Sequence, residues 1–168
     1  MVPSLFIINT RLPHRQNGRV TIGRLAEFAM NIYFSCSVTG GRADQHIYKA
    51  IVDHLLAGGH EVPTAHLSDG NIMDLEAMSK PQDVYQRDVA WVTGCDVLIA
   101  EVGTPSHGVG YEIALALSLG KPVLCCYHRS RRVSKMITGN THSTLKVVTY
   151  ETEEEAMALV DEFLKSPN

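Results

Sequence analysis

Short runs of apolar residues alternate along the chain with segments in which apolar residues recur at helical spacing. The runs are unbroken, as in parallel strands that helices cover on both faces. Four of them predict buried strands at residues 31–35, 96–100, 122–127 and 145–150, and a shorter run predicts a fifth strand at 61–62.

Helical spacing and end signals predict helices between these strands. A proline at position 81 is suited to the first turn of one helix, and Gly120 is expected to end another. Thr152 with Glu155 forms a capping box for the last helix. The predicted helices span residues 43–57, 82–93, 109–119 and 134–138, and the last one ends at Lys165.

This alternation predicts one doubly wound, Rossmann-like α/β domain over residues 30–168, with a five-stranded parallel sheet flanked by helices. Residues 1–29 carry several arginines and no acid before Glu27, and are expected to form a flexible N-terminal extension. A transit segment and an upstream extension of the gene model are alternative interpretations, since Met30 directly precedes the first predicted strand. The polar connection over 66–79 is long enough to be a lid or binding loop.

Composition narrows the possible functions of the 168-residue chain. The net charge is −3, so no basic excess indicates binding to long nucleic acid. No apolar run approaches the ~20 residues that span a membrane. The 4 cysteines form no CxxC pair and the 8 histidines no HxxxH or HExxH pair. We therefore expect reduced thiols, no metal site and a cytoplasmic protein, with nuclear and organellar locations left open.

A turn rich in Gly, Pro and Ser at 102–108 follows the predicted strand at 96–100, where open α/β sheets bind ligands. Gly108 and Gly110 allow backbone N–H groups to approach a ligand, and the start of the next helix adds partial positive charge. These features predict an anion site, most simply for a phosphate. Glu112, expected on the first turn of that helix, is either a carboxylate that satisfies the helix dipole or a reactive group beside the phosphate.

Two common nucleotide-binding motifs are absent from the sequence, so no cofactor is expected. Gly103 and Gly108 have the spacing of a P-loop, but Val109 occupies the position of the phosphate-binding lysine. The turn SVTGGR at 37–42 lacks the GxGxxG spacing of a dinucleotide site.

Three segments of the sequence carry a family resemblance. They are YFSCSVTGGR at 33–42, YQRDVAWVTGCDVLIAEV at 85–102 and PSHGVGYEIALALSLGKPVLC at 105–125, with a weaker match in RRVSKMI at 131–137. Together they resemble the 2′-deoxynucleoside 5′-monophosphate N-hydrolases of the nucleoside 2-deoxyribosyltransferase superfamily. The resemblance extends over residues 31–137.

The resemblance implies roles for individual residues. Glu112 would be the nucleophile, Asp88 the acid that assists departure of the base, and Tyr33 a residue that lines the sugar and positions the nucleophile. Ser134 would reach the phosphate site of a neighbouring subunit, which implies a homodimer. The other residues implied to contact the nucleotide are Ser37, Val38, Thr39 and Gly40 around sugar, base and phosphate, and Ser106, Gly108 and Gly110 at the phosphate.

The chemistry of an N-glycosidic bond suits these residues. Its cleavage builds positive charge at C1′, which a carboxylate can stabilise or trap, and negative charge on the base, which a protonated carboxyl can neutralise. We therefore expect hydrolysis of 2′-deoxynucleoside 5′-monophosphates to a free base and 2-deoxyribose 5-phosphate. A nucleoside 2-deoxyribosyltransferase, a ribonucleotide N-glycosidase of the CMP type and a nucleotide sensor without catalysis are the alternatives.

Each residue also has a purely structural interpretation. Tyr33 fits an ordinary core aromatic residue, and Asp88 fits a solvated helix acid. Glu101 is interpreted as a structural acid that bonds loop amides. The arginine cluster at 129–132 is typical of a solvated surface, with a role facing phosphate or a second subunit as the alternative.

Overall fold

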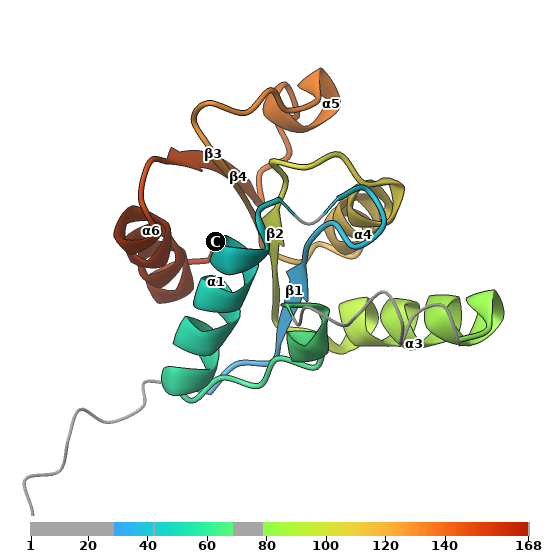
Figure 1. Ribbon diagram of the computed structural model, residues 1–168. Coiled ribbons are helices and arrows are strands. Elements are labelled where there is room, and N and C mark those ends of the chain that lie inside the picture. Colours follow the sequence, from blue (N-terminus) through green and yellow to red (C-terminus); the bar gives the residue numbers. More distant parts are fainter. Residues whose placement is uncertain (1–28, 42, 69–78, 168) are drawn as a thin grey trace, which may run out of the picture.

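A parallel sheet forms the middle layer of the computed structural model, which describes residues 29–41, 43–68 and 79–167 (Figure 1). Its strands lie in the order β1-β2-β3-β4, and every neighbouring pair is parallel. In this register Ser35 of β1 lies beside Ala100 of β2. The strands are β1 (Ile32–Ser35), β2 (Val97–Glu101), β3 (Val123–His128) and β4 (Leu145–Tyr150).

The predicted fifth strand at 61–62 is wrong, since the sheet of the described residues has four strands. Glu61 makes only an isolated parallel bridge to Asn31. Pro63 follows and has no N–H to donate to a strand ladder, and the chain then turns into the short helix η1 (Ala65–Ser68). The bridge lies on the side of β1 that faces away from β2. The chain therefore passes along one side of β1 first and places β2 on the other side, so the order of the sheet reverses between β1 and β2.

Helices cover both faces of the sheet, which confirms the predicted α/β class (Figure 1). Successive strand residues point to opposite faces, so Phe34 packs in the hydrophobic cluster of α1 and α6, whereas Tyr33 packs in that of α3 and α4. Cys125 and Cys126 divide between the two clusters in the same way. The helices are α1 (Gln45–Ala57), α3 (Pro81–Gly94), α4 (His107–Ser118), α5 (Lys135–Thr138) and α6 (Glu153–Lys165).

The starts of the helices follow local capping signals. At the start of α6, the Thr152 side chain accepts a hydrogen bond from the N–H of Glu155, as predicted. Helix α4 begins two residues earlier than predicted, because Ser106 caps it and accepts a hydrogen bond of 3.5 Å from the N–H of Val109. Glu112 therefore lies in the second turn of α4 rather than the first, where the helix dipole acts more weakly.

The carboxyl ends of the four strands lie at one edge of the sheet, and the reversal between β1 and β2 marks where doubly wound sheets bind ligands. The predicted N-terminal extension (except its last residue) and most of the 66–79 connection lie outside the described residues. Within the described residues, no helix combines the length and apolar character needed to cross a membrane.

Candidate active site

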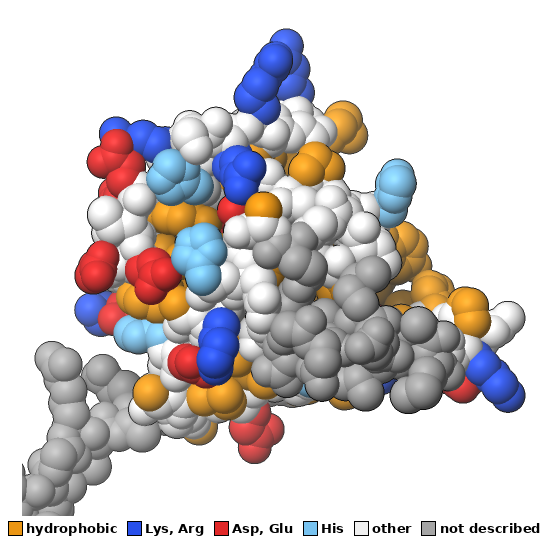
Figure 2. Space-filling view, viewed as in Figure 1, with side chains coloured by type: hydrophobic (Ala, Val, Ile, Leu, Met, Phe, Trp, Pro, Cys, Tyr) orange, Lys and Arg blue, Asp and Glu red, His pale blue; other side chains and the backbone are white. Residues whose placement is uncertain are grey.

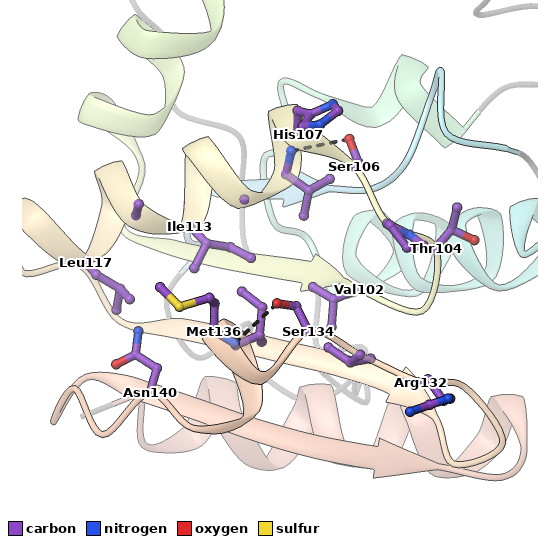
Figure 3. A pocket seen from close by; sticks show the side chains of 16 residues that line it. Val102, Thr104, Ser106, His107, Ile113, Leu117, Arg132, Ser134, Met136 and Asn140 are labelled. Atoms are coloured by element: carbon purple, nitrogen blue, oxygen red, sulfur yellow. Dashed lines mark hydrogen bonds between the residues drawn. The ribbon is translucent and has the colours of Figure 1, made fainter.

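Two cavities flank helix α4. The α4–α5 cavity has a volume of about 450 Å³ and lies between α4 and the segment 132–140, as Figure 3 shows. The second, which we call the α3–α4 cavity, has a volume of about 230 Å³. It is lined by Tyr85, Asp88, Val89, Val92, Gly108, Tyr111, Glu112 and Leu115.

Two carboxyl groups line the α3–α4 cavity, Asp88 from α3 and Glu112 from α4. Asp88 accepts a hydrogen bond of 2.8 Å from Nε of Arg87, and its side chain is 20% exposed. The Arg87 guanidinium in turn lies 4.9 Å from the ring centre of Trp91. One cavity therefore contains two acids, and one of them is paired with a cation.

The Glu112 carboxyl group is largely buried. Burial raises the pKa of Glu112, and the negative charge of Asp88 raises it further. The hydrogen bond from the Ser35 hydroxyl, the nearby hydroxyl group of Tyr33 and the positive charge of Arg87 oppose this rise in pKa. The Ser35 hydroxyl lies 2.5 Å from Oε2 of Glu112. The two hydroxyl groups thus favour the ionised form that a nucleophile needs.

Tyr33 of β1 is fully buried next to Glu112. Burial raises the pKa of Tyr33, and the negative charges of Glu112 and Asp88 raise it further. The tyrosine therefore keeps its proton at physiological pH and can donate it in a hydrogen bond.

The first turn of α4 separates the two cavities. Gly108 lines the α3–α4 cavity with the two acids, whereas Ser106 and Gly110 line the α4–α5 cavity together with Ser134. Ser134 also caps α5 by accepting a hydrogen bond of 3.2 Å from the N–H of Met136 (Figure 3). The structure thus brings the predicted phosphate residues to the two sides of one helix end.

Basic side chains follow the carboxyl end of β3 and lie along the upper edge of the molecule in Figure 2. Arg129 pairs with Glu151, and Arg131 pairs with Asp44, so two arginines of the predicted cluster have structural partners. Arg132 instead lines the α4–α5 cavity, where it adds positive charge.

The turn after β1 contains four of the predicted substrate-binding residues. Ser37 is fully buried, Val38 packs against the core, and Thr39 is exposed. A side chain at Gly40 would meet the carbonyl oxygen of Pro105, so this turn packs directly on the turn that precedes α4. The described residues that line the two cavities do not include any of these four.

Glu101 ends β2 and is fully buried. Its Oε2 accepts a hydrogen bond of 3.1 Å from the N–H of Gly103, and its Oε1 accepts one of 3.0 Å from the Tyr150 hydroxyl. Burial raises the pKa of Glu101 to about 7, although both hydrogen bonds act in the opposite direction. The predicted structural role, bonding a loop amide, is confirmed.

Asp44 joins three loops at the same edge of the sheet. Its carboxylate accepts a hydrogen bond of 2.9 Å from the hydroxyl group of Thr104, in the turn before α4. It also forms an ion pair of 2.5 Å with Arg131, in the loop after β3. These contacts fix the turn that carries the predicted phosphate residues.

Three residues near the acids were not predicted from the sequence: Ser35, Tyr85 and Tyr111. Ser35 is a polar residue at the end of an apolar strand, two positions after Tyr33, and strand periodicity places both on one face. Tyr85 and Tyr111 come from α3 and α4, with ring centres 6.2 Å apart. Their proximity depends on the packing of two helices, for which the sequence has no local signal. Among the described residues, no three His, Cys, Asp or Glu side chains form a group suited to a metal ion.

Comparisons with known proteins identify the family. The model of the nucleoside 2-deoxyribosyltransferase family matches residues 32–162. The 5-hydroxymethyl-dUMP N-hydrolase of Mus musculus is 37% identical over 140 residues, which cover 81% of this chain and 80% of that protein. A putative 2′-deoxynucleoside 5′-phosphate N-hydrolase of Methanosarcina mazei is 36% identical over 136 residues, covering 81% of this chain and 84% of that protein.

Among solved structures, the CMP N-glycosidase of Clostridium botulinum has the same fold, with a TM-score of 0.60 and 22% sequence identity. The match covers 79% of this chain and 98% of that one. The family match over residues 32–162 agrees with the position of the sheet and of the two acids. This chain therefore belongs to the nucleoside 2-deoxyribosyltransferase family.

Proposed function

We propose that the protein hydrolyses the N-glycosidic bond of 2′-deoxynucleoside 5′-monophosphates and releases a free base and 2-deoxyribose 5-phosphate. The observation that carries this proposal is that Asp88 and Glu112 line one cavity together with Gly108 of the first turn of α4. The names of the relatives at 36% and 37% identity, which are N-hydrolases of deoxynucleoside monophosphates, support the substrate class.

In this mechanism the ionised form of Glu112 is the nucleophile, and the protonated form of Asp88 is the general acid. A Glu112 oxygen bonds to C1′ while the bond from C1′ to the base nitrogen breaks, and the base leaves with the electron pair and a proton from Asp88. Water then attacks C1′ and gives a proton back to Asp88, which frees Glu112 and retains the configuration at C1′. The hydroxyl groups of Ser35 and Tyr33 support the ionised form of Glu112.

The nucleotide would lie along the carboxyl edge of the sheet, with its phosphate at the start of α4. Backbone N–H groups at the start of a helix bind phosphate without a cation, and Ser106, Gly108 and Gly110 would form this site. Tyr33 would line the sugar, and residues 37–40 would border sugar, base and phosphate. The close packing of Gly40 on Pro105 supports this arrangement, because it joins the two turns.

A nucleotide panel tests the proposed function. Deoxy and ribo nucleoside monophosphates are incubated with the protein, and free base is measured by chromatography. We expect base release from deoxynucleotides. Turnover of CMP but not dCMP would instead indicate a ribonucleotide N-glycosidase, exchange with an added second base would indicate a transferase, and binding without any turnover would indicate a sensor.

Substitution of the two acids tests their roles. Glu112→Gln is expected to lower kcat at least about 10³-fold, and Asp88→Asn about 10²- to 10⁴-fold, the range typical of a general acid. Asp83→Asn is the matched control, since Asp83 lies on α3 with an exposed side chain. Full activity of Glu112→Gln would exclude it as the nucleophile.

The covalent step can be observed directly. An arabino-configured 2′-fluoro deoxynucleotide slows the formation and hydrolysis of a glycosyl-enzyme, because the fluorine destabilises positive charge at C1′. Intact-mass spectrometry of the protein incubated with this analogue should show an added fluorodeoxyribose phosphate, and peptide mapping should place it on Glu112. Turnover of the analogue without any adduct, at single-turnover sampling times, would argue for direct attack by water.

We further propose a homodimer in which Ser134 completes the phosphate site of the neighbouring subunit. The apolar α4–α5 cavity and Met136, which is 82% exposed, support a contact on this side of α4. Co-expression of Ser134→Ala with Glu112→Gln tests it. In a mixed dimer one subunit supplies an intact Glu112 and the other an intact Ser134, so one site is intact only if Ser134 acts across subunits. Because random pairing makes about half of the dimers mixed, about a quarter of all sites should then be active.

A cytoplasmic location is also proposed. All four cysteines are buried and in the thiol form, which supports a reducing compartment. Cell fractionation with a tagged full-length chain tests this location.

A further inference from the structure

Ser35, the last residue of β1, is fully buried. Its hydroxyl donates a hydrogen bond of 2.5 Å to Oε2 of Glu112, from a different part of the chain. A hydrogen bond to a carboxylate is stronger than one between neutral groups, and it holds its partners at short range. A serine at this position therefore does more than fill space at the end of an apolar strand.

The two carboxylate oxygens of Glu112 have different surroundings. Oε2 is held by Ser35, whereas Oε1 lies on the side of Gly108, 3.9 Å from the point where a Cβ on that glycine would stand. Gly108 lines the α3–α4 cavity together with Asp88. Oε1 is therefore the carboxylate oxygen nearer to Gly108, which lines the cavity and belongs to the first turn of α4.

We propose that Ser35 is a positioning residue, which holds Oε2 of Glu112 and so presents Oε1 to the anomeric carbon. This inference rests on the proposed function, in which Glu112 forms the glycosyl-enzyme. It assigns different tasks to the two oxygens, one held by the protein and one free to react.

The assignment is consistent with both steps of the reaction. In the first step Oε1 bonds to C1′, the bond to the base breaks, and the base leaves with the electron pair and a proton from Asp88. Oε2 becomes the carbonyl oxygen of the ester and stays next to the Ser35 hydroxyl. In the second step water bonds to C1′, and the electron pair of the C1′–Oε1 bond returns to Glu112. Ser35 then stabilises the restored negative charge, which makes the carboxylate a better leaving group.

A positioning role is distinguished from a merely structural one by the pH profile. The charged and titratable groups that face Glu112 are Tyr33 from β1 and Arg87 and Asp88 from α3, and none of them changes when Ser35 is replaced. The Ser35 hydrogen bond lowers the pKa of Glu112, so its removal must raise that pKa. The acidic limb of kcat/KM should therefore move to higher pH.

The test compares Ser35→Ala with Ser35→Thr, which keeps the hydroxyl group. We expect Ser35→Ala to lower kcat about 10- to 100-fold, with KM changed less than about threefold, because the interaction supports the reacting oxygen rather than the bound substrate. Ser35→Thr should recover most of kcat and the wild-type acidic limb. If Ser35→Ala does not fold, Ser35→Cys takes its place, since a thiol has nearly the same size and is a weak donor.

Two further variants make the outcome unambiguous. Ser118→Ala removes an exposed serine of the same helix as Glu112, whose hydroxyl donates a hydrogen bond of 2.7 Å to the Leu115 carbonyl oxygen, and it should leave kcat unchanged. Glu112→Gln, assayed in parallel, tests the proposed function itself. If Glu112→Gln is inactive while the Ser35 variant keeps its kcat and acidic limb, the positioning role is overturned and the proposed function stands. If Glu112→Gln is active, the proposed function fails first.

Discussion

The Tyr150 hydroxyl donates a hydrogen bond of 3.0 Å to Oε1 of Glu101, and both residues are buried where β2 and β4 end. Among the described residues this buried carboxyl has two hydrogen-bond donors, the Tyr150 hydroxyl and the N–H of Gly103, which compensate poorly for the loss of water. The pKa of Glu101 accordingly rises to about 7, with Asp44 raising it and Arg131 lowering it as smaller effects. The protein thus contains an acid that titrates near neutral pH beside the turn that leads into α4.

This pKa makes stability depend on pH. The pKa of Glu101 is higher in the folded protein than its ordinary value of 4.5, so the folded state binds more protons between these two pH values. Its contribution to the free energy of unfolding therefore falls as pH rises from about 4.5 to about 7. Glu101→Gln removes this titration. The free energy of unfolding of the variant, relative to that of the wild type, should therefore rise by about 1–3 kcal/mol from pH 5 to pH 8. Urea unfolding at several pH values measures the difference.

Two variants check the cause. Glu61→Gln changes an exposed acid and should show no such gain with pH. Tyr150→Phe removes a hydrogen bond that lowers the pKa of Glu101, so it should move the pH dependence to still higher pH. A difference between Glu101→Gln and the wild type that stays constant from pH 5 to pH 8 would show that Glu101 does not titrate in this range.

The ion pair of Asp44 and Arg131 is expected to stabilise the site. The Asp44 side chain is 10% exposed and that of Arg131 39%, so removing the arginine leaves a shielded carboxylate without its cation. Arg131→Met should lower the free energy of unfolding by more than Arg129→Met does, because the cation that it removes is paired with a largely buried carboxylate. Arg129→Met, whose partner Glu151 is 49% exposed, should change it by less than about 1 kcal/mol.

A double-mutant cycle separates this pair from other effects. If the ion pair carries the stabilisation, Asp44→Asn combined with Arg131→Met should be less destabilising than the sum of the single changes. Additive effects would mean that the two side chains act independently, with Asp44 acting mainly through its hydrogen bond from Thr104.

Most of the fold could be predicted because unbroken apolar runs identify strands buried on both faces. The four observed strands lie within one residue of these runs. The prediction of a strand at 61–62 is wrong because a strand also needs N–H groups that donate hydrogen bonds, and Pro63, the next residue, has no N–H. The predicted start of α4 is two residues late because Ser106, a good capping residue, precedes two glycines that weaken the helical pattern.

The candidate site could also be predicted from the sequence only in part. Local patterns and the family resemblance point to Asp88 and Glu112, and the structure places both in one cavity. They do not identify Ser35, whose partner lies on a helix that follows a different strand. Which residue faces which carboxylate oxygen depends on the register of β1 with β2, and this register arises only when the sheet forms.

The buried thiols provide a test of the core. Burial raises the pKa of Cys125 to about 12 and that of Cys126 well above its ordinary value. Since only the thiolate reacts with disulfide reagents, the native protein should react slowly with Ellman's reagent at pH 8. Unfolding in guanidinium chloride should then release all 4 thiols at once. Rapid reaction of Cys125 or Cys126 in the native state, mapped by mass spectrometry, would contradict this packing.

The contact of Gly40 with Pro105 provides the last prediction. A Cβ on Gly40 would run into the backbone carbonyl oxygen of Pro105 and stand 2.7 Å from Oγ of Ser37, so at least one of the two turns must move. Gly40→Ala should lower the free energy of unfolding by about 1–3 kcal/mol and raise KM for deoxynucleotides, because the displaced turn leads into α4. Gly94→Ala is the matched control, since a Cβ there meets nothing within 4 Å, and it should change stability by less than about 1 kcal/mol. Urea unfolding and steady-state kinetics of both variants measure these effects. Equal stability and equal KM of the two variants would mean that the turns can move apart without a change in either quantity.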